Sequence, residues 1–405
     1  MRQLLADRTA RTYLAGQGLS VLGDTALWLA MGVWVKTLTG SNAAAGLVFF
    51  AFAAPLALGP LAGQLVDRVR RRPLLIAVNV GGAAVVLLLL LVRGPADVWL
   101  IYGVMFLYGV AYALIGPAQS ALLTALLPPA QLGPANAALQ TVRQSLRLFA
   151  PLLGASLIAA FGAAPVVALD AATFLAAAVS LLMIQVTEPR PRPTGEPWRR
   201  ALVAGIAHVA RTPVLWQLAV STGVAVLVVG FAETTAFAVV DTGLHRPPVF
   251  LGVLISAQGA GAVVSGVLSA PAMRRAGGGA LVAIGMFVFA AGAALQMLPS
   301  LVPVLLGSVL WGVAVPWINV AFLTLIQRWT PRELQGRVYS AMDTAIAVPQ
   351  SVSIAIGAGL SGLLDYRLML LAMAAVIGLA GAYLATRPEQ RASPPAELPS
   401  DARVT

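Results

Sequence analysis

Long apolar segments follow one another along the whole chain, and short polar turns separate them. A membrane-spanning helix needs roughly 20 mainly apolar residues, and about twelve segments reach that length. They lie near residues 12–35, 43–66, 73–92, 98–126, 136–161, 166–186, 214–240, 249–272, 280–298, 302–327, 338–362 and 367–386. This pattern predicts an all-α membrane protein with about twelve transmembrane helices.

The polar stretch TEPRPRPTGEPWRR at 187–200 is the longest of the turns, and it divides the spans six and six. A Pro- and Ala-rich segment follows the last span and is expected to be disordered. The predicted parts are an N-terminal six-helix bundle (1–186), a cytoplasmic central linker (187–212), a C-terminal six-helix bundle (213–386) and a cytoplasmic tail (387–405).

The two halves of the chain are similar to one another at a separation of 203 residues. Under this shift the fifth span matches the eleventh, although a few matches among small residues also arise by chance. Duplicated bundles are typical of transporters, which hold their substrate near the bilayer midplane between the repeats. The matched positions are Gly133 with Gly336, Thr141 with Thr344, Arg147 with Gln350, and Gly154 with Gly357.

The composition excludes an ordinary soluble domain. Hydrophobic residues make up 59% of the chain and charged residues 10%, and the mean hydropathy is +0.87. A soluble domain is about half apolar and about a quarter charged. The chain has no cysteine and only two histidines, His208 and His245. Disulfides, thiolate metal sites and histidine-rich metal centres are therefore excluded, and we expect no metal site.

A net charge of +11 suggests nucleic-acid binding in a soluble protein, but the positions of the basic residues indicate membrane orientation instead. With the N-terminus inside, the predicted cytoplasmic segments hold 20 arginines, whereas the outer loops hold Lys36, Arg93, Arg246 and Arg367. Cytoplasmic loops carry an excess of Lys and Arg, so we expect both termini in the cytoplasm and no nucleic-acid partner. The first span is too long for a signal-peptide core, so we expect it to be retained.

A dense group of charges interrupts the apolar pattern between the second and third spans, in GQLVDRVRRR at 63–72. Arginines on this short turn hold it at the lipid phosphates, but Asp67 adds nothing to that signal. Gly63 lies one turn earlier and suits close helix approach. An acid is stabilised at the positive N-terminus of a helix, so we expect Asp67 to latch onto the eleventh span near Arg337. The residues expected to orient its carboxylate are Arg68, Arg71 and Arg72.

The same stretch resembles the loop signature of the major facilitator superfamily, glycine-x-x-x-aspartate-arginine-x-glycine-arginine-arginine. Arg70 stands where the signature has glycine, and the other five positions match. The resemblance covers nearly all of residues 12–386. It implies two pseudo-symmetric six-helix bundles, secondary transport by alternating access, and a bacterial cytoplasmic membrane as the location. Four further stretches resemble the macrolide-efflux and enterobactin-export permeases: SVLGDTALWLA (20–30), TGSNAAAGLV (39–48), ANAALQ (135–140) and GRVYS (336–340).

Two departures from the superfamily pattern argue against proton antiport. The antiporter signature of the fifth helix ends glycine-proline-x-x-glycine-glycine, and this chain has APLLGA at 150–155, in which both flanking glycines are alanine. The fourth span also lacks the arginine that many proton-coupled members carry there. The second-half copy of the loop signature, SAPAMRRAGG at 269–278, keeps only its arginine pair.

Few ionisable residues fall inside the predicted spans, and each is therefore a candidate for function. Asp24 lies about twelve residues into the first span, or roughly 18 Å at 1.5 Å per residue, near the middle of a slab about 30 Å thick. Gln17 and Trp28 share its helix face. Arg147 lies at a similar depth, and because an unpaired midplane arginine costs about 2.5–3.5 kcal/mol, we expect it to pair with Asp24. The alternative for Asp24 is a packing role, bonded to a neighbouring hydroxyl.

Other polar residues in the spans are weaker candidates. Glu233 in the seventh span has either a gating or coupling role or a structural one, and Asp343 either pairs or caps near the cytoplasmic face. Tyr108 and Tyr112 lie too deep in the fourth span for an interfacial aromatic belt, so we expect them to line a cavity. Asn319 in the tenth span is a further candidate for the cavity wall.

These observations predict a secondary active transporter, in the first instance a proton-coupled exporter of an amphiphilic, drug-like or metabolite molecule. The alternative is an importer, or a lipid or metabolite permease, on the same fold. We expect a monomer that needs no cofactor, is driven by the proton gradient, and has a small-molecule substrate and membrane lipids as partners.

An intramembrane enzyme or a nucleotide-driven pump fits the sequence poorly. GLSG at 359–362 resembles the serine motif of rhomboid proteases, but such a serine needs a base within hydrogen-bonding reach. Both histidines fall at or beyond the ends of spans. No phosphate-binding G-x-x-x-x-G-K-[ST] loop occurs in the chain, which excludes a pump of that class.

Overall fold

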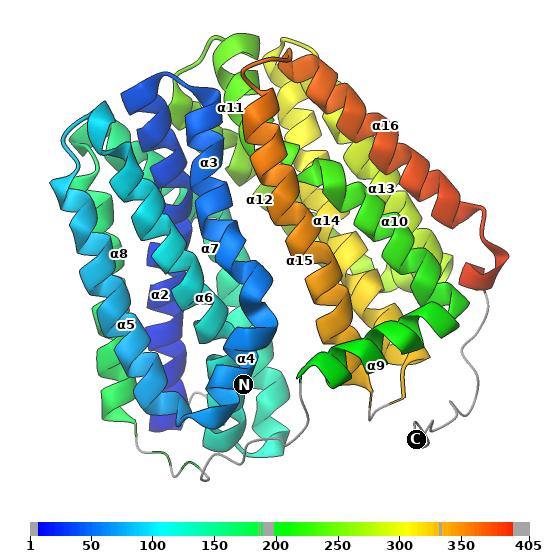
Figure 1. Cartoon of the computed structure of the whole chain (residues 1–405), viewed down its shortest axis with the longest axis horizontal. Coiled ribbons are helices and arrows are strands. Elements are labelled where there is room, and N and C mark those ends of the chain that lie inside the picture. The colour runs from blue at the N-terminus through cyan, green and yellow to red at the C-terminus, as the bar shows by residue number, and fades with distance from the viewer. Residues whose placement is uncertain (1–6, 185, 187, 189–197, 332–333, 392–405) are drawn as a thin grey trace. The chain divides into compact units, whose positions relative to one another are not determined.

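The computed structural model describes residues 7–184, 186, 188, 198–331 and 334–391. All regular structure in these residues is helical, and no strand occurs in them (Figure 1). The expectation of an all-α protein is therefore confirmed. In the predicted linker, residues 187 and 189–197 lie outside the described residues, and residues 198–211 form a helix. Most of the predicted tail, residues 392–405, also lies outside them.

The described residues form fifteen α-helices, with short 3-10 or π segments between some of them. In the first half they are α2 (Arg8–Thr39), α3 (Asn42–Ala53), α4 (Gly59–Arg68), α5 (Arg71–Leu87), α6 (Val98–Leu126), α7 (Pro129–Phe161) and α8 (Ala164–Met183). In the second half they are α9 (Trp198–Arg211), α10 (Pro213–Val229), α11 (Phe231–Ala238), α12 (Leu251–Ala276), α13 (Gly278–Gln296), α14 (Leu301–Trp329), α15 (Gln335–Leu360) and α16 (Tyr366–Ala385).

Ten helices of the described part are long and apolar enough to cross a membrane. The two other expected spans are helical as well. The second is divided into α3, a 3-10 segment η1 (Ala54–Leu58) and α4, because Pro55 cannot donate the backbone hydrogen bond that a continuous helix needs. The eleventh is the continuous helix α15, which polar residues such as Asp343 and Gln350 make less apolar.

Local sequence signals set the helix ends. The Asp7 carboxylate accepts hydrogen bonds from the backbone N–H groups of Thr9 (2.8 Å) and Ala10 (3.2 Å), which caps the start of α2. Gly40 ends that helix at a φ of 69°, a left-handed conformation that glycine adopts without strain. Ser41 then caps α3 through Ala44 (3.2 Å). The turn TGSN is thus a helix stop followed at once by a helix start.

The chain divides into two compact units. The first unit comprises Met1–Gly195 and Ala236–Gly259, and the second comprises Glu196–Thr235 and Ala260–Thr405. The first unit therefore includes residues 236–259 from the second half of the sequence, whereas the second unit contains only residues from Glu196 onward. The division into bundles at 186 and 213 stays a prediction from the apolar pattern and the internal similarity.

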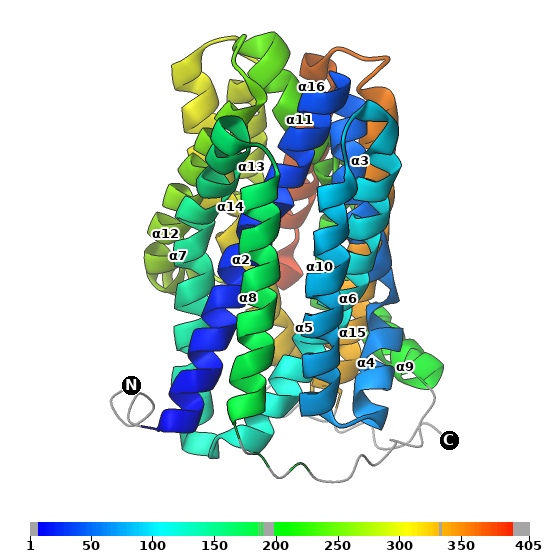
Figure 2. The same ribbon diagram turned by 90° about the vertical axis from the view of Figure 1, so that its left-hand side faces the viewer.

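In the first unit, α2 lies between α7 and α8, as Figure 2 shows. Small residues allow this close packing. A Cβ atom on Gly16 would lie 2.6 Å from Cβ of Ser180 on α8, and one on Gly154 of α7 would lie 2.8 Å from the carbonyl carbon of Ala26. Glycine is thus required where the backbones of neighbouring helices meet.

The same packing recurs in the second unit at the position predicted by the 203-residue shift. Gly357 of α15 is the counterpart of Gly154, and a Cβ atom there would lie 3.0 Å from the Cα atom of Phe231. Ser353, one turn away, donates a hydrogen bond to the Leu227 carbonyl (2.7 Å). The fifth and eleventh spans therefore have equivalent close contacts with the first and seventh.

Residues 236–259 join the first unit through specific contacts. The Lys36 ammonium at the end of α2 forms an ion pair with Asp241 (2.6 Å) and donates to the Gly40 carbonyl (2.7 Å). Asp241 belongs to η4 (Val239–Gly243), a short π-helical segment after α11. Ser256 of α12 donates to the Leu148 carbonyl on α7 (2.7 Å). Lys36, expected in an outer loop, is thus a buried residue of a helix end.

The turn between α4 and α5 is bound to the end of α8 by hydrogen bonds. The Glu188 carboxylate accepts hydrogen bonds from the backbone N–H groups of Arg71 (2.6 Å) and Arg72 (2.8 Å), so it caps α5. The Arg72 guanidinium donates to the carbonyls of Leu181 (2.8 Å) and Leu182 (3.1 Å) at the C-terminal end of α8. Arg72 therefore satisfies helix carbonyls, where we had expected it to orient a neighbouring carboxylate.

The side chain of Asp67 lies outside the described residues, so the latch expected between Asp67 and the eleventh span stays a prediction. Arg68 is exposed at the end of α4, and Gly63 has open space around it, with no atom within 4 Å of a Cβ built there. The close helix approach expected at Gly63 therefore stays a prediction.

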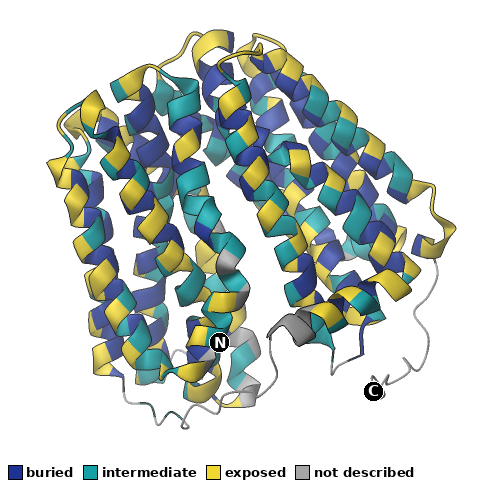
Figure 3. Ribbon diagram, viewed as in Figure 1, coloured by how far each residue is buried: buried dark blue, intermediate teal, exposed yellow. Residues whose placement is uncertain are grey.

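Large apolar side chains remain exposed on the outer faces of many helices, where Figure 3 shows rows of exposed positions. Val267 of α12, Leu379 of α16 and Trp99 of α6 keep 74%, 70% and 69% of their surface exposed. Water would disfavour so much exposed apolar surface, whereas the hydrocarbon core of a bilayer accommodates it.

The helix contacts predict unequal effects of glycine substitutions. Gly154→Ala and Gly357→Ala should each lower the free energy of unfolding by about 1–3 kcal/mol, because the added methyl group meets backbone atoms that cannot move aside. Gly81→Ala on α5 is the matched control, since no atom lies within 4 Å of the added Cβ and alanine favours a helix. Thermal unfolding of the purified protein in detergent measures the three variants. Equal melting temperatures for all three would contradict this account of the packing.

Candidate functional site

A cavity of about 250 Å³ lies in the first unit, against α2, α6 and α7. Its wall combines charged, amide and apolar side chains. Four of the residues predicted from the sequence line it: Gln17, Asp24, Tyr112 and Arg147. The remaining lining residues are Ser20, Val21, Thr25, Ile115, Gly116, Gln119, Gln140 and Arg143.

Asp24 is held by a hydrogen bond from the neighbouring helix α6. The Tyr108 hydroxyl donates to Oδ1 of Asp24 over 2.5 Å. Tyr108 itself is buried and lies behind the cavity wall, packed edge-on against Phe174 with ring centroids 5.5 Å apart. Tyr108 is therefore not one of the residues that line this cavity, although we had expected it to be. Its hydroxyl supplies the partner that a carboxyl group needs away from water.

A second carboxyl group reaches the same hydroxyl. Oδ1 of Asp170, on α8, lies 3.4 Å from the Tyr108 oxygen. Asp170 is fully buried, and its Oδ2 atom has no hydrogen-bond partner. Gly23 makes room for it, because a Cβ atom on Gly23 would lie 2.6 Å from Asp170 Oδ1. Asp24, Tyr108 and Asp170 thus form one cluster, which we call the carboxyl–tyrosine cluster.

Counting protons in this cluster assigns its charge. Tyr108 has a single hydroxyl proton, and the short bond to Asp24 uses it. That proton leaves at most a weak second contact for Oδ1 of Asp170, which lies 3.4 Å away. A buried ionised carboxylate with one unpaired oxygen would cost several kcal/mol. We therefore expect Asp170 to be a neutral carboxylic acid, and Asp24 is the group that faces the cavity.

Asp170 was missed from the sequence, although a signal for it existed. It is the one charged residue in the apolar sixth span, in VVALDAATFLAAAVSLLM, and any ionisable residue inside a span is a candidate for function. Its partner could not be identified in the same way, since Tyr108 is separated from it by 62 residues.

The expected pairing of Asp24 with Arg147 is not formed in this structure. Asp24 instead accepts a hydrogen bond from Tyr108. Arg147 and Arg143 both line the cavity, and Arg143 donates to Oε1 of Gln119 over 3.4 Å. Gln119 in turn donates to Gln17. The pairing of Asp24 with Arg147 therefore stays a prediction for another conformation.

The other predicted residues lie away from this cavity. Trp28 belongs to α2 but packs on Phe49, with ring centroids 4.7 Å apart. Glu233 and Asn319 belong to the second unit, together with Asp343. No group of three or more metal-ligating residues occurs among the described residues.

The second unit has apolar residues at the positions equivalent to the carboxyl–tyrosine cluster. The 203-residue shift lays Asp24 on Leu227, Tyr108 on Trp311 and Asp170 on Met373. Trp311 donates its indole N–H to the Phe289 carbonyl (3.0 Å) and stacks on that ring. Related scaffolds thus carry a polar cluster in one half of the sequence and packed apolar side chains in the other.

The residues of the serine-protease alternative also have other partners. Ser361 donates its hydroxyl to the Ala358 carbonyl of its own helix end (2.8 Å). The His208 ring lies 3.0 Å from the Trp329 carbonyl. Neither side chain is paired with the other, so the arrangement that a serine nucleophile needs is not formed between them.

The protonated state of Asp170 leads to a spectroscopic prediction. At neutral pH the infrared spectrum should contain the C=O band of a protonated carboxyl group, and Asp170→Asn should remove it. The fold should persist, with the free energy of unfolding changed by less than about 1 kcal/mol, because the amide can donate to the Tyr108 oxygen as the acid does. Asp97→Asn is the control and should leave the band unchanged, since Asp97 is a half-buried residue outside the carboxyl–tyrosine cluster and asparagine can still accept the hydrogen bonds from Arg93 and Gly94. A band that survives in Asp170→Asn would contradict the assignment.

Comparison with known proteins gives a family and a fold. The family model of the Major Facilitator Superfamily matches residues 13–245 and 224–404. The uncharacterized MFS-type transporter YfiS of Bacillus subtilis (strain 168) is 25% identical over 372 residues, which cover 85% of this chain and 85% of YfiS. The narrower resemblance to macrolide-efflux and enterobactin-export permeases stays an expectation.

Solved structures share the fold at low sequence identity. The nucleoside transporter NupG is 13% identical, with a TM-score of 0.72 over 94% of this chain and 99% of that one. The POT family transporter PepTSo is 11% identical, with a TM-score of 0.72 over 93% and 97%. A bacterial homologue of the iron transporter ferroportin, in its inward-facing state, is 16% identical, with a TM-score of 0.68 over 93% and 98%.

Proposed function

Because the chain belongs to the Major Facilitator Superfamily and is a multi-pass membrane transporter, we propose that it works by alternating access and couples transport to proton movement through Asp24. The substrate is a small amphiphilic molecule held in the cavity of the first unit. We also propose that the protein is a monomer in a bacterial cytoplasmic membrane, with both termini in the cytoplasm.

One observation carries the proposal: two carboxyl groups meet a single tyrosine hydroxyl at the edge of a cavity. Two carboxyl groups so close together cannot both ionise away from water, so they titrate as a pair. Asp170 is buried, whereas Asp24 lines the cavity. Asp24 is therefore the member that exchanges its proton, while Tyr108 and Asp170 hold it in position.

The cavity wall supports an amphiphilic substrate. Val21 and Ile115 are apolar, and Tyr112 adds an aromatic face that is 47% exposed. Amide and charged groups line the rest of the wall. Sites for small molecules generally combine an apolar wall with a few polar groups that fix orientation.

The charge of the substrate decides which way a proton gradient drives it. A cationic substrate competes with the proton for Asp24, so exchange results and an inward proton gradient drives export. This is the first candidate, and it agrees with the resemblance to efflux permeases. An anionic substrate binds better once Asp24 is neutral, so proton and substrate move together into the cell. The presence of Arg143 and Arg147 in the cavity favours this second candidate, uptake.

Proteoliposomes with an imposed pH difference test the proposal. Each unit of pH difference is worth about 1.4 kcal/mol per proton, so a coupled substrate should reach up to about tenfold accumulation. Asp24→Asn should abolish accumulation and proton flux but keep exchange of substrate across the membrane, because it removes the titrating proton and leaves the cavity intact. The probes are cationic, neutral and anionic aromatic compounds, and a trapped pH-sensitive dye reports proton flux.

Asp97→Asn is the matched control, since it removes a carboxylate of the same unit that does not line the cavity. It should transport like the unsubstituted protein. The direction in which the anionic or cationic probe accumulates decides between uptake and export. Proton flux that persists in Asp24→Asn would refute the role of Asp24.

A further inference from the structure

We infer that the cavity of the first unit binds a small organic anion through Arg143 and Arg147. This inference rests on the proposed function, because it names the substrate class of the same cavity. The anionic group is a carboxylate, a phosphate or a sulfonate, and the rest of the molecule is apolar or aromatic.

The first argument is the charge of the cavity. Arg143 and Arg147 both line it and stand four residues apart on α7, so they lie on the same helix face. Asp24 is the one carboxylate among the lining residues, and Tyr108 already donates to it. The cavity carries two positive charges when Asp24 is protonated and one when it is ionised.

The second argument is the cost of this arrangement. Ionisable groups at membrane depth are expensive and normally have a partner, and like charges one helical turn apart repel each other. The protein partner in the structure for Arg143 is the amide oxygen of Gln119, at 3.4 Å, a long contact by the standards of hydrogen bonds. A ligand that brings negative charge would reduce both costs.

The third argument is the shape of the donors. A guanidinium group presents a planar set of N–H donors that matches two oxygens of a carboxylate or phosphate. Gln140 lies on the same wall and can add an amide donor. Tyr112 and Ile115 form an apolar part of the wall, which suits the body of an amphiphilic anion. The volume of about 250 Å³ admits a molecule with one or two aromatic rings.

Protonation of Asp24 is expected to strengthen anion binding. The Arg143 charge acts on the Asp24 carboxylate, so an ionised Asp24 competes with the ligand for the arginine. A proton on Asp24 removes that competition. Binding of a proton to Asp24 and binding of the anion therefore favour each other, so the proton and the anion would be transported together.

Calorimetric titration of the full chain in a neutral detergent tests the inference without any gradient or transport. The probes are 1-naphthoate and 1-naphthamide, which have the same ring system and differ in charge. Naphthoate should bind at least about tenfold more tightly than naphthamide, in line with the strength of a hydrogen bond to a charged group. Arg147→Gln should weaken naphthoate at least about tenfold and leave naphthamide unchanged, while Arg147→Lys, which keeps the charge, should lose less.

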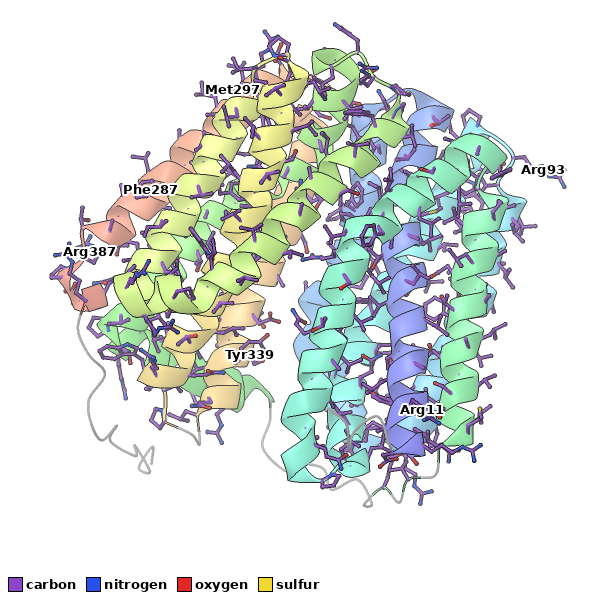
Figure 4. All side chains as sticks on the ribbon, turned by 180° about the vertical axis from the view of Figure 1, so that it is seen from behind. Arg11, Arg93, Phe287, Met297, Tyr339 and Arg387 are labelled. Carbon is purple, nitrogen blue, oxygen red and sulfur yellow. The ribbon has the colours of Figure 1, made fainter. Side chains whose placement is uncertain are left out.

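Arg93→Gln is the matched control, because it removes one positive charge of the same unit from a side chain that points away from the fold in Figure 4. It should not change either affinity. Equal binding of the two probes, or equal losses in Arg147→Gln and Arg93→Gln, would overturn the inference.

Two further measurements separate this inference from its alternatives. Asp24→Asn should bind naphthoate severalfold more tightly; if it does so but the unsubstituted protein moves no protons, the anion site stands and proton coupling fails.

An anionic lipid headgroup offers the same chemistry as a free anion. The affinity for naphthoate is measured in phosphatidylcholine nanodiscs with and without phosphatidylglycerol. Equal affinities support a free anion as the ligand. A loss of about tenfold with phosphatidylglycerol shows that the lipid headgroup occupies the site and overturns the inference of a free anion.

Discussion

The close approach of helix backbones around α2 is the constraint on which the first unit depends. Glycines on α2 and α7 leave space for backbone or polar atoms of the neighbouring helix. Because lipid tails are as apolar as the helix surfaces, helices in a membrane associate mainly through such packing and through hydrogen bonds between them. Because Gly23 has no side chain, α8 can lie close to α2, and the carboxyl group of Asp170 reaches the Tyr108 hydroxyl beside Asp24. The polar cluster is therefore a consequence of how near the helices lie.

The two halves of the chain use equivalent packing for different chemistry. Gly154 and Gly357 occupy equivalent positions in close helix contacts, yet the polar cluster occurs only where the first half supplies it. In the second half, Trp311 and Met373 fill the equivalent space. Packing constrains backbone positions more than side-chain polarity, so a duplicated scaffold can keep its contacts while one copy acquires titrating groups.

The turn between α4 and α5 illustrates how a loop signature acts through ordinary helix chemistry. A helix leaves its last carbonyls and its first N–H groups without intrahelical partners. Arg72 satisfies such carbonyls at the end of α8, and Glu188 satisfies such N–H groups at the start of α5. Both bonds join the third span to the sixth, so part of the charge in this turn stabilises the first unit itself.

The sequence by itself determined the helices, their approximate limits and the transporter class. These features depend on the length and polarity of continuous segments and on motifs within one turn, all of which are local. It also identified Asp24, Gln17, Tyr112 and Arg147 as separate candidates, because helical periodicity and depth can be counted along a span, and all four line the cavity. The division of the second span into three helical pieces, by contrast, depends on how Pro55 is accommodated.

Only the tertiary structure decided which groups meet. Asp24 has Tyr108 as its partner, 84 residues away, and not the arginine at matching depth. Asp170 joins them from a third helix. Depth along a span is a one-dimensional property, whereas a hydrogen bond also requires that two helix faces be turned toward each other. That rotation is set by the packing of all neighbouring helices at once, and no single segment of the sequence contains it.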